Sequence, residues 1–115
     1  SIDILSRFSN LQIPERSVHA ITTPGVVMGW WDLHQQYGKI DWAELFSFGI
    51  EFATQGFAVS KISAREWRLF DKVLHADQTS AKTFRAGNTP AEGDIFINLD
   101  LAGVFKNIQK FKFMR

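Results

Sequence analysis

Hydrophobic and polar positions follow a helical period over several stretches of this chain. Between Val26 and Tyr37, apolar and aromatic residues return every three or four positions, and Gly38 follows as a natural end to a helix. The pattern predicts a helix from about Val26 to Tyr37.

A second helix is predicted to begin after Asp41. Asp41 stands three residues before Glu44, which is the spacing of a capping box, and Gly56 is a natural end. The broad apolar face of this helix would comprise Trp42, Leu45, Phe46, Gly49, Ile50 and Ala53.

A third helix is predicted from Ser60 or Ser63 to about His75. Both serines offer an N-cap hydroxyl, and Glu66 stands three residues beyond Ser63. Its inward face would carry Ile62, Trp67, Phe70 and Leu74.

The segment after His75 alternates turns with short elements. We expect a helical turn near residues 80–84 that ends at Gly87, followed by turns across 88–94 that are rich in Gly, Asn, Asp and Pro. Residues 95–97 are expected to form one extended pairing.

A last helix is predicted after Asn98, whose side chain can cap it, while Asp100 in the first turn suits the helix dipole. Its apolar stripe comprises Leu101, Val104, Phe105, Ile108 and Phe111. Phe111 and Phe113 near the end of the chain predict that the natural chain continues or packs on a partner.

Residues 1–23 show no sustained helical period, and Pro14 and the Thr23-Pro24-Gly25 turn interrupt them, so we expect a short strand and then an extended loop. The fold class is therefore mainly α, with about four to five helices and little strand. With 115 residues, 45% of them hydrophobic, the chain is long enough for one compact domain.

Composition excludes several functions. The net charge of +1 gives no field that would attract nucleic acid or an anionic membrane, and no apolar run is long enough to span a bilayer. Without cysteine, disulfides, thiolate zinc sites and cysteine nucleophiles are excluded. Aromatic residues make up 14% of the chain, which suggests surfaces that another part of a protein covers.

Candidate catalytic groups are weak in the sequence. His19, His34 and His75 have no second ligand at metal-binding spacing, and no motif for a serine nucleophile or for phosphate binding is present, so we predict no metal and no cofactor. Thr22-Thr23 could in principle become a new N-terminus with a threonine nucleophile, but a turn into the following helix is the expected role.

The acidic residues also look structural. The pairs Asp71 with Asp77 and Glu92 with Asp94 lie on segments expected to be solvated, with no reason for shifted pKa values.

Taken in order, these residues resemble the large subunit of the γ-glutamyltranspeptidases. The resemblance covers nearly the whole chain, and its most specific part runs from Val18 to Ser60. It is carried by residues 17–31, Leu33-His34, Tyr37-Gly38, residues 42–46, residues 56–60, Phe84, Gly87, Pro90, Gly93-Asp94 and residues 98–102.

The resemblance implies that residues 1–115 are a single interior segment of a large subunit. The parent enzyme would be an αββα N-terminal-nucleophile hydrolase that cleaves itself into two subunits and acts on γ-glutamyl amides such as glutathione. Its catalytic threonine is the first residue of the small subunit, outside this chain, so we expect no catalytic residue here and no activity from this chain alone. The partners implied are the γ-glutamyl substrate and the remaining large-subunit and small-subunit portions.

Arg7 is the one candidate substrate-binding residue. Taken by itself, it is either a surface arginine, the commoner case, or a bidentate fork for a carboxylate. Residues 2–7 resemble the family stretch in which an arginine grips the α-carboxylate of the glutamyl donor, and Arg7 would take that role.

Two alternatives remain open at this point. The chain could belong to a catalytically inactive helical interaction or scaffold module derived from the family, or to a related acylase of the same fold that acts on β-lactam side chains or poly-γ-glutamate. Donor and acceptor specificity, compartment and oligomeric state are not determined by these residues.

Overall fold

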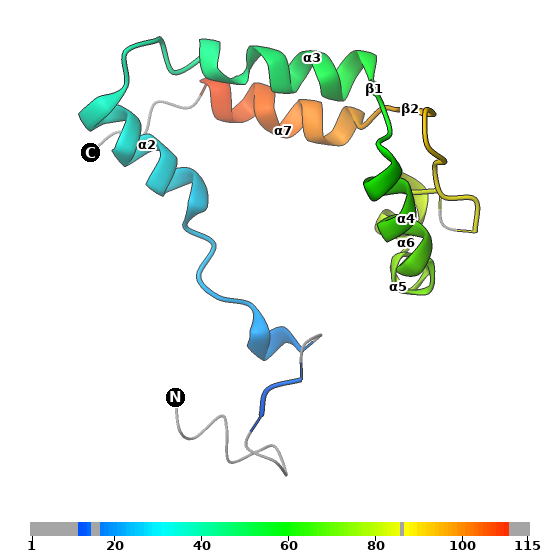
Figure 1. Ribbon diagram of the computed structural model, residues 1–115. Helices are drawn as coiled ribbons and strands as arrows, with labels where there is room; N and C mark the ends of the chain where they lie inside the picture. Colours follow the sequence, from blue (N-terminus) through cyan, green and yellow to red (C-terminus); the bar gives the residue numbers. More distant parts are fainter. Residues whose placement is uncertain (1–11, 15–16, 86, 111–115) are drawn as a thin grey trace. The chain divides into compact units, whose positions relative to one another are not determined.

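The computed structural model describes residues 12–14, 17–85 and 87–110 (Figure 1). The length favours one compact domain, whereas the chain divides into two compact units, Ser1–Tyr37 and Gly38–Arg115. The assignment of residues 1–115 to a single large-subunit segment concerns a longer polypeptide and stays a prediction.

The first unit contains one short 3-10 helix and one α-helix. The 3-10 helix η1 spans Val18–Ala20 within the predicted loop, because the Ser17 hydroxyl accepts a hydrogen bond from the His19 amide at 3.2 Å. Helix α2 spans Val26–Tyr37, as the apolar period predicted. No residue of α2 is buried.

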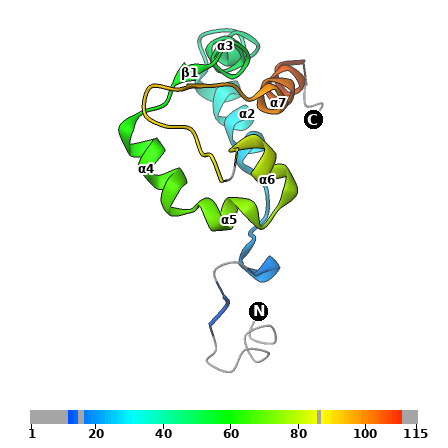
Figure 2. The ribbon, with the colours of Figure 1, turned by 90° about the vertical axis from the view of Figure 1, so that its right-hand side faces the viewer.

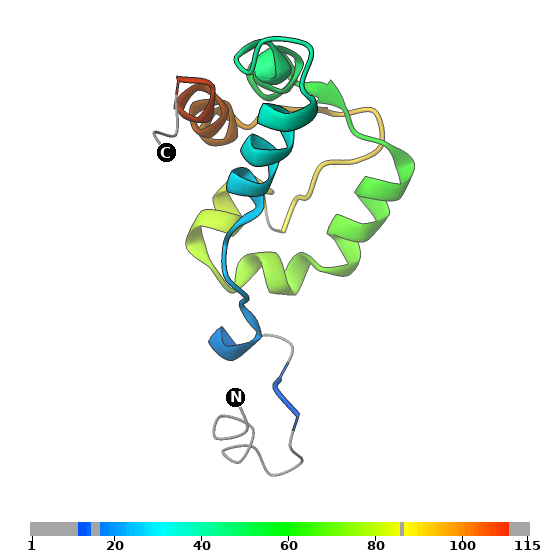
Figure 3. The same cartoon turned by 90° about the vertical axis from the view of Figure 1, so that its left-hand side faces the viewer.

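The second unit is mostly helical, which confirms the predicted fold class. Its elements in chain order are η2 (Glu44–Phe46), α3 (Ser47–Gln55), β1 (Phe57–Ala58), α4 (Lys61–Leu69), α5 (Asp71–His75), α6 (Gln78–Thr83), β2 (Ile95–Phe96) and α7 (Leu99–Lys110). Figures 2 and 3 show α4, α5 and α6 following one another around the loop that leads to β2.

Helices α3 and α7 pack side by side (Figure 1). Gly49 makes this close approach possible, because a Cβ there would lie 3.2 Å from the Phe105 ring. The Phe46 ring packs edge-on against Trp42 and also contacts Phe105. The Trp42 indole N–H donates to the Ile108 carbonyl at 3.1 Å, so this aromatic group satisfies its polar atom while it is buried.

A second aromatic group fills the space between α4, α6 and β2. Phe96 packs against Trp67 at a centroid distance of 4.9 Å and stacks on Phe84 at 5.7 Å. Val59 and Ala64 complete this core, with only 2% and 3% of their surfaces exposed. Burial of these side chains is the main stabilising contribution at this end of the unit.

The two strands form a short antiparallel pair in which Phe57 lies opposite Phe96 and Ala58 opposite Ile95. The predicted extended pairing of residues 95–97 is thus confirmed at Ile95 and Phe96. Main-chain hydrogen bonds extend the pairing on both sides, from the Val59 amide to the Asp94 carbonyl and from the Asn98 amide to the Ala53 carbonyl, both 2.9 Å.

The predicted third helix is divided in two. Phe70 leaves helical geometry at φ −97° and ψ 11°, so α4 ends at Leu69 and α5 begins at Asp71. The inward positions of Ile62 and Phe70 were also wrong, since 74% and 50% of their surfaces are exposed. Ser60 caps α4 through the Ser63 amide, and in that register Ala64 and Trp67 face the core while Ile62 points to the opposite side.

The other helix ends agree more closely with those predicted from the sequence. The Asn98 side chain accepts from the Leu101 amide at 2.9 Å and caps α7 as predicted. Asp41 accepts from the Ala43 amide at 2.8 Å, and the first turn after it is the 3-10 helix η2 rather than α-helix. Gly56 ends α3 as predicted.

We expect Gly56→Ala to destabilise the complete polypeptide. Gly56 has φ 90° and ψ 168°, a region that essentially only glycine adopts, at a cost of about 1–3 kcal/mol for other residues. An added Cβ would also lie 2.5 Å from the Ile95 side chain. Thermal unfolding should show a lower Tm for this variant. Gly103→Ala is the control, since an added Cβ there meets nothing within 4 Å. An unchanged Tm for Gly56→Ala would contradict the described contact between Gly56 and Ile95.

Candidate functional site

Arg7, the predicted substrate-binding residue, lies outside the described residues. Its role as a fork for the donor carboxylate therefore stays a prediction.

Thr22 and Thr23 are exposed in the extended segment before α2. The Thr23 carbonyl accepts from the Gly25 amide at 2.9 Å, and the Gly25 carbonyl accepts from the Gly29 amide at 3.0 Å. These bonds confirm the predicted turn that leads the extended segment into the helix.

The three histidines lie on different elements. His19 is in η1, His34 is half-buried on α2, and His75 is on α5 in the second unit. Among the residues that the structure describes, no group of three or more His, Asp or Glu side chains is placed to hold a metal ion. Nor does any helix in that part of the chain have the length and hydrophobicity required of a membrane span.

Asp71 connects α5 to the loop after α6. One carboxylate oxygen accepts from the Gly87 amide at 2.7 Å, and the other lies 3.8 Å from His75 Nδ1, one helical turn away. Gly87 has φ 88°, and a Cβ there would lie 3.1 Å from the His75 ring. These contacts tie the loop at Gly87 to α5.

Asp94 organises the turn before β2. Its carboxylate accepts from the Ala91 amide at 3.0 Å, its own amide donates to the Ala91 carbonyl at 3.1 Å, and Arg85 lies 3.6 Å from the same carboxylate. Asp71 and Asp94 therefore act in the structure as hydrogen-bonded anchors of loops, although the sequence suggested only solvated charge.

The expectation of an ordinary pKa was wrong for Asp77. The hydrogen bond from the Ser80 amide to its carboxylate, 2.7 Å long, holds the pKa of Asp77 below its usual value, and the Ser80 hydroxyl acts in the same direction. Asp77 is the N-cap of α6, so the physical cause is capping and no catalytic role is implied.

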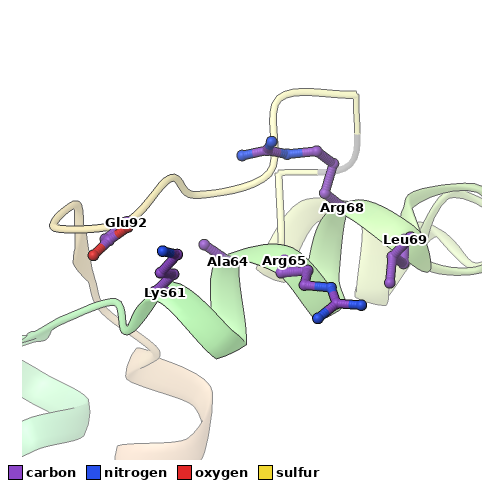
Figure 4. A pocket seen from close by; sticks show the side chains of 6 residues that line it. All are labelled: Lys61, Ala64, Arg65, Arg68, Leu69 and Glu92. Atoms are coloured by element: carbon purple, nitrogen blue, oxygen red, sulfur yellow. The ribbon is translucent and has the colours of Figure 1, made fainter.

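Among the described residues, a cationic groove lies on α4, defined by Lys61, Arg65, Arg68 and, on α5, Lys72. A cleft of about 420 Å³ is lined by three of these cations together with Ala64, Leu69 and Glu92. Figure 4 shows Glu92, carried by the loop before β2, on the same side of the helix as Lys61.

A second cleft of about 650 Å³ shares Arg68 and Leu69 with the first and continues past Lys72 to residues 87–89. This groove was not predicted from the sequence. Its signal was the spacing of Lys61, Arg65 and Arg68, which are four and three residues apart and so share one face of a helix.

Comparison with known proteins assigns the chain to a class. Residues 3–115 match the family model described as gamma-glutamyltranspeptidase. The chain is 44% identical over 97 residues to a glutathione hydrolase proenzyme of Pseudomonas aeruginosa, covering 77% of this chain and 15% of the relative. It is 32% identical over 92 residues to the glutathione hydrolase-like YwrD proenzyme of Bacillus subtilis, covering 78% of this chain and 18% of the relative.

Solved structures share the fold. Cephalosporin acylase from Bacillus halodurans superposes with a TM-score of 0.81 at 23% identity, covering 96% of this chain and 22% of that chain. A γ-glutamyltranspeptidase from Pseudomonas nitroreducens superposes with a TM-score of 0.70 at 28% identity, covering 84% of this chain and 29% of that chain.

The described fold is thus that of a class of enzymes that includes γ-glutamyltranspeptidases and cephalosporin acylase. Within that class, the chain belongs to the γ-glutamyltranspeptidase family. It spans less than a fifth of the length of the two curated relatives, 15% of one and 18% of the other.

Replacing Asp77 should change how α6 responds to acid. Since the folded-state pKa is lowered, its stabilising contribution is present above the pKa of unfolded Asp, about 3.9, and is lost as the pH falls through the lower folded value. Asp77→Ala should therefore speed hydrogen exchange of the α6 amides at neutral pH. Asp77→Asn retains a capping oxygen, so the α6 amides should stay protected from exchange. That protection should no longer depend on acid, because the amide side chain does not titrate. Equal exchange in all three proteins at neutral pH would show that this cap does not stabilise α6.

Proposed function

We propose that this chain is part of an enzyme that transfers or hydrolyses the γ-glutamyl group of amides such as glutathione. The observation that carries the proposal is the family match over residues 3–115, supported by 44% identity to a glutathione hydrolase proenzyme. The relatives are named as proenzymes, in keeping with a polypeptide that is processed before it acts.

The proposed chemistry is covalent catalysis by a threonine that lies outside this chain. After self-cleavage, that threonine would be the first residue of the small subunit, and its own α-amine would take the hydroxyl proton as the hydroxyl attacks the γ-carbonyl of the donor. The amide C–N bond then breaks and the leaving amine takes that proton. Water or an acceptor amine next attacks the acyl-enzyme, which releases glutamate or the new γ-glutamyl amide and regenerates the threonine.

The contribution of residues 1–115 would be scaffold and donor binding. The paired strands would hold together the helices of the second unit, and Arg7 would fix the donor by its α-carboxylate so that the γ-carbonyl faces the nucleophile.

A related acylase is the second candidate. The TM-score of 0.81 to cephalosporin acylase favours it, but at 23% identity that likeness shows the shared fold alone. The sequence identity is higher to glutathione hydrolases, so we place the activity with γ-glutamyl donors. A catalytically inactive module would share the fold without either activity.

The complete polypeptide should cleave itself into two subunits and release the anilide from a γ-glutamyl anilide. Residues 1–115 alone should release none, because the proposed nucleophile is not among them. Intact-mass analysis measures the self-cleavage, and absorbance measures the released anilide. An uncleaved and inactive complete polypeptide would favour the inactive module, and preferential release of a β-lactam side chain would favour the acylase.

Arg7→Ala in the complete enzyme should raise the KM for the γ-glutamyl anilide by roughly tenfold or more. A hydrogen bond to a charged group contributes about 1.5–3 kcal/mol, and about 1.4 kcal/mol corresponds to a factor of ten. The kcat should change less, since the carboxylate is bound in both the ground state and the transition state.

A donor without the α-carboxylate, 4-aminobutyryl anilide, provides the control for Arg7. The unsubstituted enzyme should process it poorly, and Arg7→Ala should cause no further loss with it. Arg16→Ala is the matched arginine substitution in the same part of the sequence and should leave both donors unaffected. Equal losses of Arg7→Ala on both donors would refute a contact between Arg7 and the carboxylate.

A further inference from the structure

No salt bridge among the described residues involves a lysine or arginine of the cationic groove. Within the described residues, the side chains of Lys61, Arg65 and Arg68 make no salt bridge or hydrogen bond, although Glu92 lines the same cleft. Three cations within about 10 Å of helix axis repel one another, so an anionic group that contacts them would lower the electrostatic free energy of the folded enzyme.

The groove is long enough to bind an extended polypeptide segment. Its two clefts share Arg68 and Leu69 and so run on from Lys61 to Lys72 and Asn88. The floor includes the buried Ala64, and Figure 4 shows the Arg65 and Arg68 side chains extending from α4 in different directions. An extended segment advances about 3.3 Å per residue, so three to five residues would cover the cations of α4 and reach α5.

An exposed apolar side chain within the groove favours protein as the partner. Leu69 lines both clefts and exposes 65% of its surface. A free inorganic anion would leave Leu69 in water, whereas a polypeptide can cover it and also present carboxylates to the arginines. The concave opening, flanked by Glu92 and Asp71, is less suited to a flat anionic lipid surface.

We infer that the cationic groove binds an acidic segment of the same polypeptide, one that lies outside residues 1–115. The relatives are more than five times as long as the part that this chain matches, so most of the folded enzyme is available to supply such a segment. The inference rests on the family's length and on the groove itself, and it does not depend on the proposed catalytic activity.

Carbodiimide coupling of the complete polypeptide tests this contact. The reagent joins a lysine amine to a carboxylate only where the two touch, and mass spectrometry of the digest identifies both. Lys61 or Lys72 should couple to an Asp or Glu outside residues 1–115. Lys106, which is exposed on α7 and outside both clefts, should not couple to the same carboxylate.

Two further experiments test whether the arginines hold the segment and whether it belongs to the same molecule. Arg65→Gln combined with Arg68→Gln should reduce the yield of that cross-link several-fold, while a mixture of ¹⁴N- and ¹⁵N-labelled protein should show that both ends come from one molecule. The inference is overturned if Lys61 and Lys72 couple only to Glu92 or to nothing, since the groove is then open to solvent. It is equally overturned if the cross-links join two copies, because the partner is then a second molecule.

Discussion

The antiparallel contact between residues 57–58 and 95–96 is the constraint on which the second unit depends. It brings together segments almost forty residues apart in sequence, and Phe96 projects from it into the aromatic group formed with Trp67 and Phe84. On one side of the strands, the bond from Asn98 to Ala53 starts α7 next to the end of α3. On the other side, Ser60 caps α4 two residues after β1, so the starts of α4 and α7 both adjoin this short pair.

The parts of this fold that were predictable are those in which a local signal decides the structure. The apolar period of Val26–Tyr37 and the Asn98 cap required no knowledge of distant residues, and both were confirmed. The break at Phe70 was not predictable in that way, because a periodic sequence continues through it. The partner of residues 95–97 was also hidden, since two-residue strands carry no periodicity of their own.

The candidate site shows the same difference between what a local sequence signal predicts and what depends on distant residues. Arg7 came from a resemblance between sequences and not from any physical signal in the chain, and it lies outside the described residues. The groove on α4 had a physical signal in the spacing of its cations, but spacing alone does not distinguish a solvated helix face from a cleft. Only the loop that carries Glu92 and the residues at 87–89 closes the space beside the helix.

Many large apolar side chains on the described surface are exposed, among them Phe48 of α3 with 72% of its surface accessible. Exposure on this scale is unusual for an independent domain and is what a segment of a larger enzyme would show. It agrees with the family match and with the small share of each relative that the chain covers. The segment's low buried content follows from the same fact, since its outer faces are apolar in places that the rest of the enzyme would cover.

The central claim is that the chain belongs to an enzyme that forms a γ-glutamyl acyl-enzyme. The most direct test is intact-mass analysis of the complete polypeptide, acid-quenched while it processes a γ-glutamyl donor. We expect two subunits, the smaller beginning with threonine and carrying one γ-glutamyl group. A processed enzyme that turns over the donor with no adduct on that threonine, or a single chain that takes up no label, would contradict it.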